Sequence, residues 1–149
     1  MLTSDFVAYA GKVLAFFGAP KEPNEIRSLV SSTISTIAKK CMSEGASLIG
    51  HIKCIAEVDS GKYIACSVVS ADSEAICRGD LNAPSSRLEI ILNVLLYGLD
   101  KRKVEDIVVR SAREVFTGKA TKLELEDLEH EHDHCDEEHE NHDHEEQGH

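Results

Sequence analysis

Side chains that bind transition metals crowd residues 130–149 of the chain. Imidazole nitrogens and thiolates are ligands that Zn²⁺, Ni²⁺ and Co²⁺ prefer, whereas Ca²⁺ and Mg²⁺ take oxygen ligands. If the segment is extended, the alternating His130, His132 and His134 project to one side. If it is helical, His130 and His134 lie one turn apart, and so do Cys135 and His139. The full set of candidate ligands is His130, His132, His134, Cys135, His139, His142, His144 and His149.

Carboxylates surround these ligands. Thirteen Asp or Glu residues and no Lys or Arg lie between Leu123 and His149. They reduce the electrostatic cost of gathering divalent cations, supply further ligand atoms and favour protonated imidazole. Metal ions compete with protons for the histidine nitrogens. We therefore expect metal binding to weaken steeply as the pH falls below neutral, with several protons released for each ion bound.

A natural tract rich in histidine is a metal-binding composition. Residues 130–149 resemble the histidine-rich extensions of nickel and zinc metallochaperones, such as those that serve urease and hydrogenase maturation. The resemblance implies a metal-binding metallochaperone, store or buffer for Ni²⁺, Zn²⁺ or Co²⁺. It covers only this segment, and the chain lacks the GxxxxGK[ST] loop of a GTPase. The irregular spacing favours several adaptable sites over one closed tetrahedral site.

Two other functions stay open. In the first, the protein is an interaction or regulatory module, and the acidic segment docks or solubilises it. In the second, His51 and a cysteine of the body, residues 1–122, form an enzyme site, although the sequence contains no recognisable catalytic motif. His51 is the only histidine before His130, and a lone strand histidine is more often a surface residue. We expect no enzyme.

The charge divides the chain into two parts. The formal net charge is −11, but Met1–Lys122 carries 14 acidic residues against 16 basic ones. No aliphatic or aromatic residue follows Leu128. A segment without apolar side chains cannot offset its ordering entropy. The sequence therefore predicts a small domain over residues 1–122 and a disordered, acidic, His-rich C-terminal tail over residues 123–149.

Composition also bears on partners and compartment. The polyanionic tail and the absence of a basic stripe argue against nucleic-acid binding. No apolar run approaches the length of a membrane span, and the start of the chain reads as an amphipathic helix and not as a signal peptide. We expect a cytoplasmic protein whose body binds a protein partner or forms a homo-oligomer. Its five cysteines should then stay reduced.

The first part of the body reads as two helices. Phe6, Ala10, Val13, Leu14 and Phe17 recur at helical spacing, and Gly18-Ala19-Pro20 ends the segment. A second helix should begin at an N-cap on Asn24 and close at Gly45. Its apolar stripe consists of Ile26, Leu29, Val30, Ile34, Ile37, Ala38 and Cys41.

A hairpin should follow. From Ala46 apolar residues alternate with polar ones, and Asp59-Ser60-Gly61 suits a three-residue loop. This loop predicts that Val58 pairs with Lys62, Ile52 with Val68, Cys54 with Cys66, and Ala56 with Ile64. A short third strand is expected near Ala75–Gly79, with Asp72-Ser73 as its turn. Cys54, Cys66 and Cys77 would then converge, either as a thiolate or redox site or, more often for free cysteines, as small core residues.

Arg87–Tyr97 fits both a helix and a strand. We favour the strand, because Gly98-Leu99-Asp100 resembles a strand-to-helix turn in which Asp100 caps the next helix. That helix ends at Thr117-Gly118. The predicted fold class is α+β: an antiparallel sheet of about four strands with two N-terminal helices and one C-terminal helix, followed by the tail.

Overall fold

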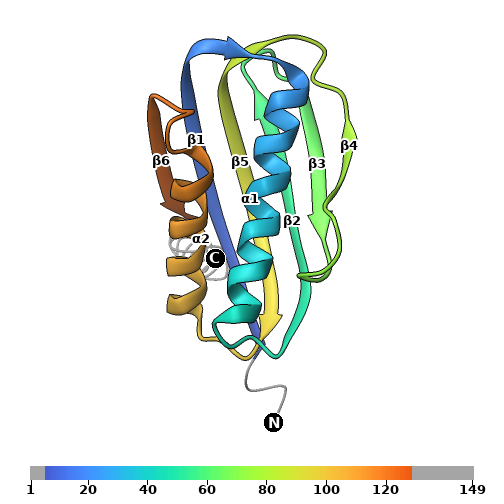
Figure 1. Ribbon diagram of the computed structural model, residues 1–149, viewed down its shortest axis with the longest axis vertical. Helices are drawn as coiled ribbons and strands as arrows, with labels where there is room; N and C mark the ends of the chain where they lie inside the picture. The colour runs from blue at the N-terminus through green and yellow to red at the C-terminus, as the bar shows by residue number, and fades with distance from the viewer. Residues whose placement is uncertain (1–5, 129–149) are drawn as a thin grey trace, which may run out of the picture.

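The computed structural model describes residues 6–128, in which six antiparallel strands form one sheet and two helices cover one of its faces (Figure 1). The strand order across the sheet is β4-β3-β2-β5-β1-β6. The elements in chain order are β1 (Phe6–Lys21), α1 (Pro23–Ser43), β2 (Leu48–Val58), β3 (Tyr63–Val68), β4 (Ile76–Gly79), β5 (Ser85–Tyr97), α2 (Lys101–Phe116) and β6 (Lys122–Asp127).

The predicted first helix is wrong, because this segment is the long strand β1. Its side chains alternate between the core and the opposite face, and Val7, Val13 and Ala15 are buried. Phe6 and Leu14 on the opposite face are apolar as well. A strand with apolar residues on both faces produces helical spacings by coincidence. The long-range pairing with β5, which begins at Phe6 opposite Tyr97, determines the outcome.

The predicted fold class is also wrong in its count of elements: the described residues contain six strands and two helices. The second strand missing from the prediction is β6, which lies, except for its first residue, in the segment assigned to the tail. Lys122 pairs with Phe16, and Asp127 pairs with Gly11, so β6 forms the edge of the sheet beside β1. Leu123 and Leu125 turn toward the core and pack against it.

The predicted hairpin is confirmed. Cys54 pairs with Cys66, and the amide of Val58 donates to the carbonyl of Lys62 at 3.0 Å. Gly61 has a φ of +90°, a left-handed conformation that favours glycine over residues with a Cβ. The strand assignment of Arg87–Tyr97 is confirmed too, because β5 pairs along its length with both β1 and β2.

Both helices lie close to the predicted places. In α1 the first helical residue is Pro23, which suits the first turn because proline has no N–H to leave unpaired. Asn24 is therefore inside the helix and is not its N-cap. The predicted cap of α2 is confirmed, since the Asp100 carboxylate accepts a hydrogen bond from the backbone N–H of Lys103 at 2.8 Å.

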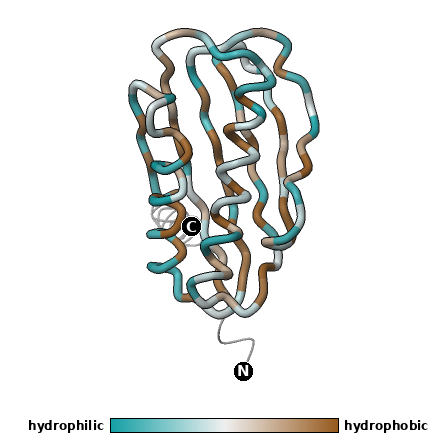
Figure 2. Tube along the Cα trace, in the orientation of Figure 1, coloured by the Kyte–Doolittle hydropathy of each residue, from teal (hydrophilic) through white to brown (hydrophobic). Residues whose placement is uncertain are grey.

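The hydrophobic core lies between the helices and one face of the sheet. Residues from every element except the edge strands β4 and β6 are fully buried there, including Ile34, Leu92 and Phe116. Apolar and polar residues alternate along several strands, and the apolar stripes of both helices turn toward the sheet (Figure 2). Within residues 6–128, neither helix combines the length and apolarity needed to cross a bilayer. Neither α1 nor α2, the two helices of residues 6–128, lies on the opposite face of the sheet (Figure 1).

Candidate functional site

The predicted metal ligands of the tail, from His130 to His149, lie outside the described residues. β6 ends at Asp127, three residues before His130. The tail ligands therefore follow an edge strand that is paired with β1. Between these strands the Lys12 ammonium lies 3.3 Å from the Glu126 carboxylate.

The described part of the body holds no group of three or more His, Cys, Asp and Glu side chains arranged to bind a metal ion. His51 is half-buried on β2, opposite Leu95 of β5. The pairing of these strands shifts its register between Ile49 and His51. A Cβ at Gly50 would lie 3.2 Å from the carbonyl oxygen of Leu95, so the backbone of β5 passes close to this glycine.

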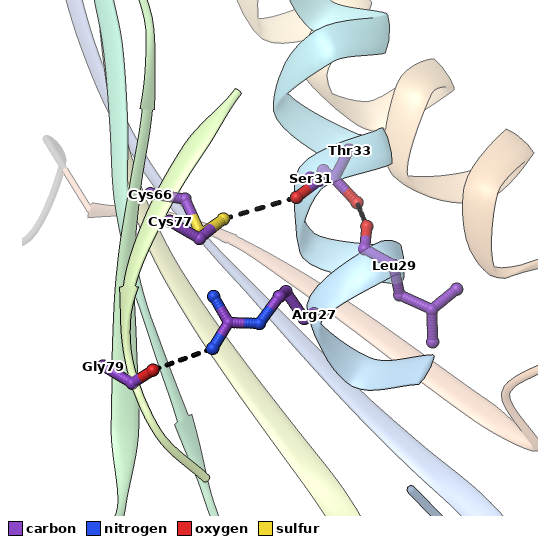
Figure 3. The surroundings of a disulfide bond; sticks show 7 residues. All are labelled: Arg27, Leu29, Ser31, Thr33, Cys66, Cys77 and Gly79. Atoms are coloured by element: carbon purple, nitrogen blue, oxygen red, sulfur yellow. Dashed lines mark hydrogen bonds between the residues drawn. A yellow bond between two sulfur atoms is a disulfide. The ribbon is translucent and has the colours of Figure 1, made fainter. Parts of the chain in front are cut away.

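The three cysteines of the sheet form one row across β2, β3 and β4. Cys54 pairs in register with Cys66, and Cys66 with Cys77. A disulfide joins Cys66 to Cys77 (Figure 3), so the expectation that every cysteine stays reduced is wrong. The bond crosses between adjacent strands, and it ties the four-residue edge strand β4 to β3.

The two free cysteines of the described body, Cys41 and Cys54, are buried thiols. Burial raises the pKa of Cys54 to about 11, because the low-dielectric interior disfavours the thiolate. Burial and the nearby Glu44 charge raise the pKa of Cys41 to about 12. A thiolate is the form that attacks electrophiles and ligates metals. Neither cysteine is therefore suited to a thiolate site, and both act as small core residues.

Two side chains of α1 hold β4 from the core side (Figure 3). The Arg27 guanidinium donates to the carbonyl oxygen of Gly79 at 2.7 Å, and the Ser31 hydroxyl lies within hydrogen-bond distance of Cys77 Sγ at 3.3 Å. Together with the disulfide, these contacts secure a strand that pairs with a single neighbour.

A cluster of charges connects the two helices at one end of the molecule. Glu44, just after α1, accepts two hydrogen bonds from Arg110 of α2, at 2.8 and 3.0 Å. Lys103 lies 3.1 Å from the same carboxylate. The hydrogen bonds from Arg110 and then Lys103 lower the pKa of Glu44 to about 2. This arrangement is structural, because it joins two helices and its donors and acceptors are used internally.

The sheet face opposite α1 and α2, here called the open face, carries several exposed apolar side chains in the described part of the chain. It consists of the outward side chains of the six strands. Ile55 and Ile91 pair directly at its centre and are 46% and 37% exposed. They border a shallow hollow that Ile76 and Asn93 also line. The large exposed apolar side chains on the strands of this face are Phe6, Leu48, Ile55, Tyr63, Ile76 and Ile91.

Residues of opposite charge lie on either side of the centre of the open face along β2. Lys53 and Glu57 precede and follow Ile55 on β2, and both are exposed. Neither forms a salt bridge with another residue of the described part. Glu57 lies opposite Glu89 on β5, and like charges in such a cross-strand pair repel. The Arg87 guanidinium lies 3.2 Å from the Glu89 carboxylate and offsets its charge, whereas Glu57 has no such salt bridge within the described residues.

Sequence reasoning missed both the disulfide and the open face. The disulfide could have been predicted only from the pairing register of β3 with β4, which places Cys77 opposite Cys66. The turn before β4 does not determine that register. The open face does not follow from the sequence prediction, because that prediction makes β1 a helix. Comparison of the sequence with models of known protein families gives no match, and comparison with curated proteins finds no relative.

Proposed function

We propose that this protein binds divalent transition-metal ions, Ni²⁺, Zn²⁺ or Co²⁺, through the tail, and acts as a chaperone, store or buffer for them. The observation that carries the proposal is compositional: seven of the eight histidines and one cysteine lie among carboxylates in residues 130–149. Ligands of this kind in irregular spacing suit several exchangeable ions.

The features of the described body are compatible with metal binding by the tail alone. Its free thiols are buried, and their raised pKa values make them poor ligands. Its single histidine, His51, lies opposite an apolar residue. The metal ligands proposed here are therefore those of the tail, while the body supplies a stable support.

Titration calorimetry with each ion tests the proposal. The full chain should bind more than one ion at micromolar or tighter affinity. A chain that ends after Leu128 keeps β6 and should lose this binding. A better matched variant replaces the seven tail histidines with asparagine, which preserves the length and the carboxylates. If this variant bound as tightly as the original chain, histidine ligation would be excluded.

The pH dependence is a second test. Imidazole binds metal only when it is deprotonated, and its ordinary pKa is about 6.5. Affinity should therefore be much weaker at about pH 5.5 than at about pH 7.5, with protons released on binding. Equal affinities at the two pH values would contradict the proposal.

A further inference from the structure

We propose that two copies of this chain pack open face to open face, around a two-fold axis that lies parallel to the sheet, about 15° from the perpendicular to its strands, and passes by Ile55 and Ile91. Four observations carry this inference: the uncovered apolar centre, the size of the face, the charge pattern along β2 and the like-charged pair Glu57–Glu89. The inference is independent of metal binding.

The centre of the open face is apolar where the proposed axis crosses it. Ile55 and Ile91 face each other across β2 and β5, the two middle strands of the sheet. Ala65 continues this row on β3. Under the proposed symmetry each isoleucine meets its own counterpart, and the four side chains exclude water together. Burial of such side chains is the main favourable term in protein association.

The face is large enough for a stable interface. One residue of a strand covers about 16 Å² of a sheet face, so β1, β5, β2 and β3 together present about 700 Å². Standard stable interfaces bury about 600–1,000 Å² on each partner, a range that includes this area. Face-to-face packing of two sheets is also a common geometry, with the strand directions about 30° apart.

The charges are self-complementary under this axis. Lys53 and Glu57 lie two residues before and after Ile55 on one strand. A two-fold axis through Ile55 that is close to perpendicular to the strand brings each of these positions over the other. Lys53 of each copy then faces Glu57 of the other copy, which gives two equivalent pairs. The Glu57–Glu89 repulsion within one copy is relieved by the incoming ammonium group.

The other basic residues of the central row are compatible with this packing. Lys12 lies in the same row as Ile91, and Glu126 neutralises it at 3.3 Å. Arg78 lies on the edge strand β4. Because the strands of the two sheets cross at about 30°, the β4 strands of the two copies are displaced from each other. At this distance from the axis the displacement is about two residues along the strand, so Arg78 does not face Arg78 of the other copy.

The symmetry makes a charge-exchange experiment possible. In K53E both intermolecular pairs become Glu–Glu, and in E57K both become Lys–Lys, so each single variant should dissociate about tenfold or more readily than the original chain. The double variant K53E/E57K restores both pairs with the signs exchanged. Its dimerisation should return to within a few-fold of the original. An equimolar mixture of the two single variants should also associate, because each supplies the charge that the other lacks.

Sedimentation velocity of the full chain in EDTA and low salt measures these effects over a range of micromolar concentrations. K39E reverses an exposed charge on α1, away from the open face, and should leave the association unchanged. Thermal unfolding of every variant checks that each one is folded. I91D removes the apolar centre and should give a monomer.

Several results would overturn the proposal. One is a monomeric original chain throughout the range, which would leave the open face to a different protein or to a lipid surface. Another is a pair of single variants that behave like K39E. A double variant as weak as the singles, or a mixture that fails to associate, would exclude this axis.

Discussion

Reduction of the Cys66–Cys77 bond should lower the free energy of unfolding by about 3 kcal/mol. The two cysteines are 11 residues apart in the sequence. In the chain-entropy description, cross-linking residues at this separation removes that much conformational freedom from the unfolded state. Small domains have unfolding free energies of about 5–15 kcal/mol, so the loss is a large fraction of the total.

The loss should be visible first at one edge of the sheet. β4 pairs only with β3, and without the disulfide it is held by that ladder and by the contacts from Arg27 and Ser31. Hydrogen exchange in the reduced protein should therefore accelerate in β4 and along the adjacent edge of β3, while β5 in the middle of the sheet stays protected.

Guanidinium titrations with and without a phosphine reductant measure the free energy, with EDTA present so that metal binding does not contribute. The double variant C66A/C77A is the control, and the phosphine should not change its midpoint. C54A keeps the disulfide and should lose as much stability on reduction as the original chain does. If the original chain kept its midpoint after mass spectrometry had shown the bond to be reduced, the reasoning would be refuted.

Three further substitutions test the packing and the charges of the body. E44Q should destabilise the protein at neutral pH. The pKa of Glu44 in the folded protein is lowered from 4.5 to about 2, so its stabilising effect is present above about pH 4.5 and disappears as the pH falls toward 2. The unfolding free energies of E44Q and the original chain should therefore converge as the pH is lowered. D100A removes the hydrogen bond to the Lys103 amide and should cost about 1 kcal/mol in chemical unfolding, whereas an unchanged midpoint would show that the cap is dispensable. L92A empties a fully buried position in the middle of β5 and should cost about 2–5 kcal/mol, and a loss below about 1 kcal/mol would contradict the burial of this residue.

The sequence predicted elements whose determinants are local. The β2–β3 hairpin depends on a loop with Gly61 and on the alternation beside it, and its register followed from them. The start of α2 depends on Asp100, whose partner is only three residues away. Turn and cap chemistry act over a few residues, so one chain is enough to read them.

Elements whose partners are distant were mispredicted. β1 pairs with β5 and β6, and nothing within β1 distinguishes its two apolar faces from the stripe of a helix. β6 contains only Leu123 and Leu125 as aliphatic residues, which is a weak strand signal without its neighbour. The Cys66–Cys77 bond likewise required the β3–β4 register. In each case tertiary pairing supplies the information.

The pairing of β1 with β6 has a consequence for the order of events during synthesis. About a hundred residues separate the partners in this ladder. A ribosome that adds about 5–20 residues per second leaves the outer edge of β1 without its neighbour for about 5–20 s after that strand emerges. An unpaired edge of this length invites pairing with another nascent chain. Polysomes that translate this message should therefore depend on chaperones during that interval.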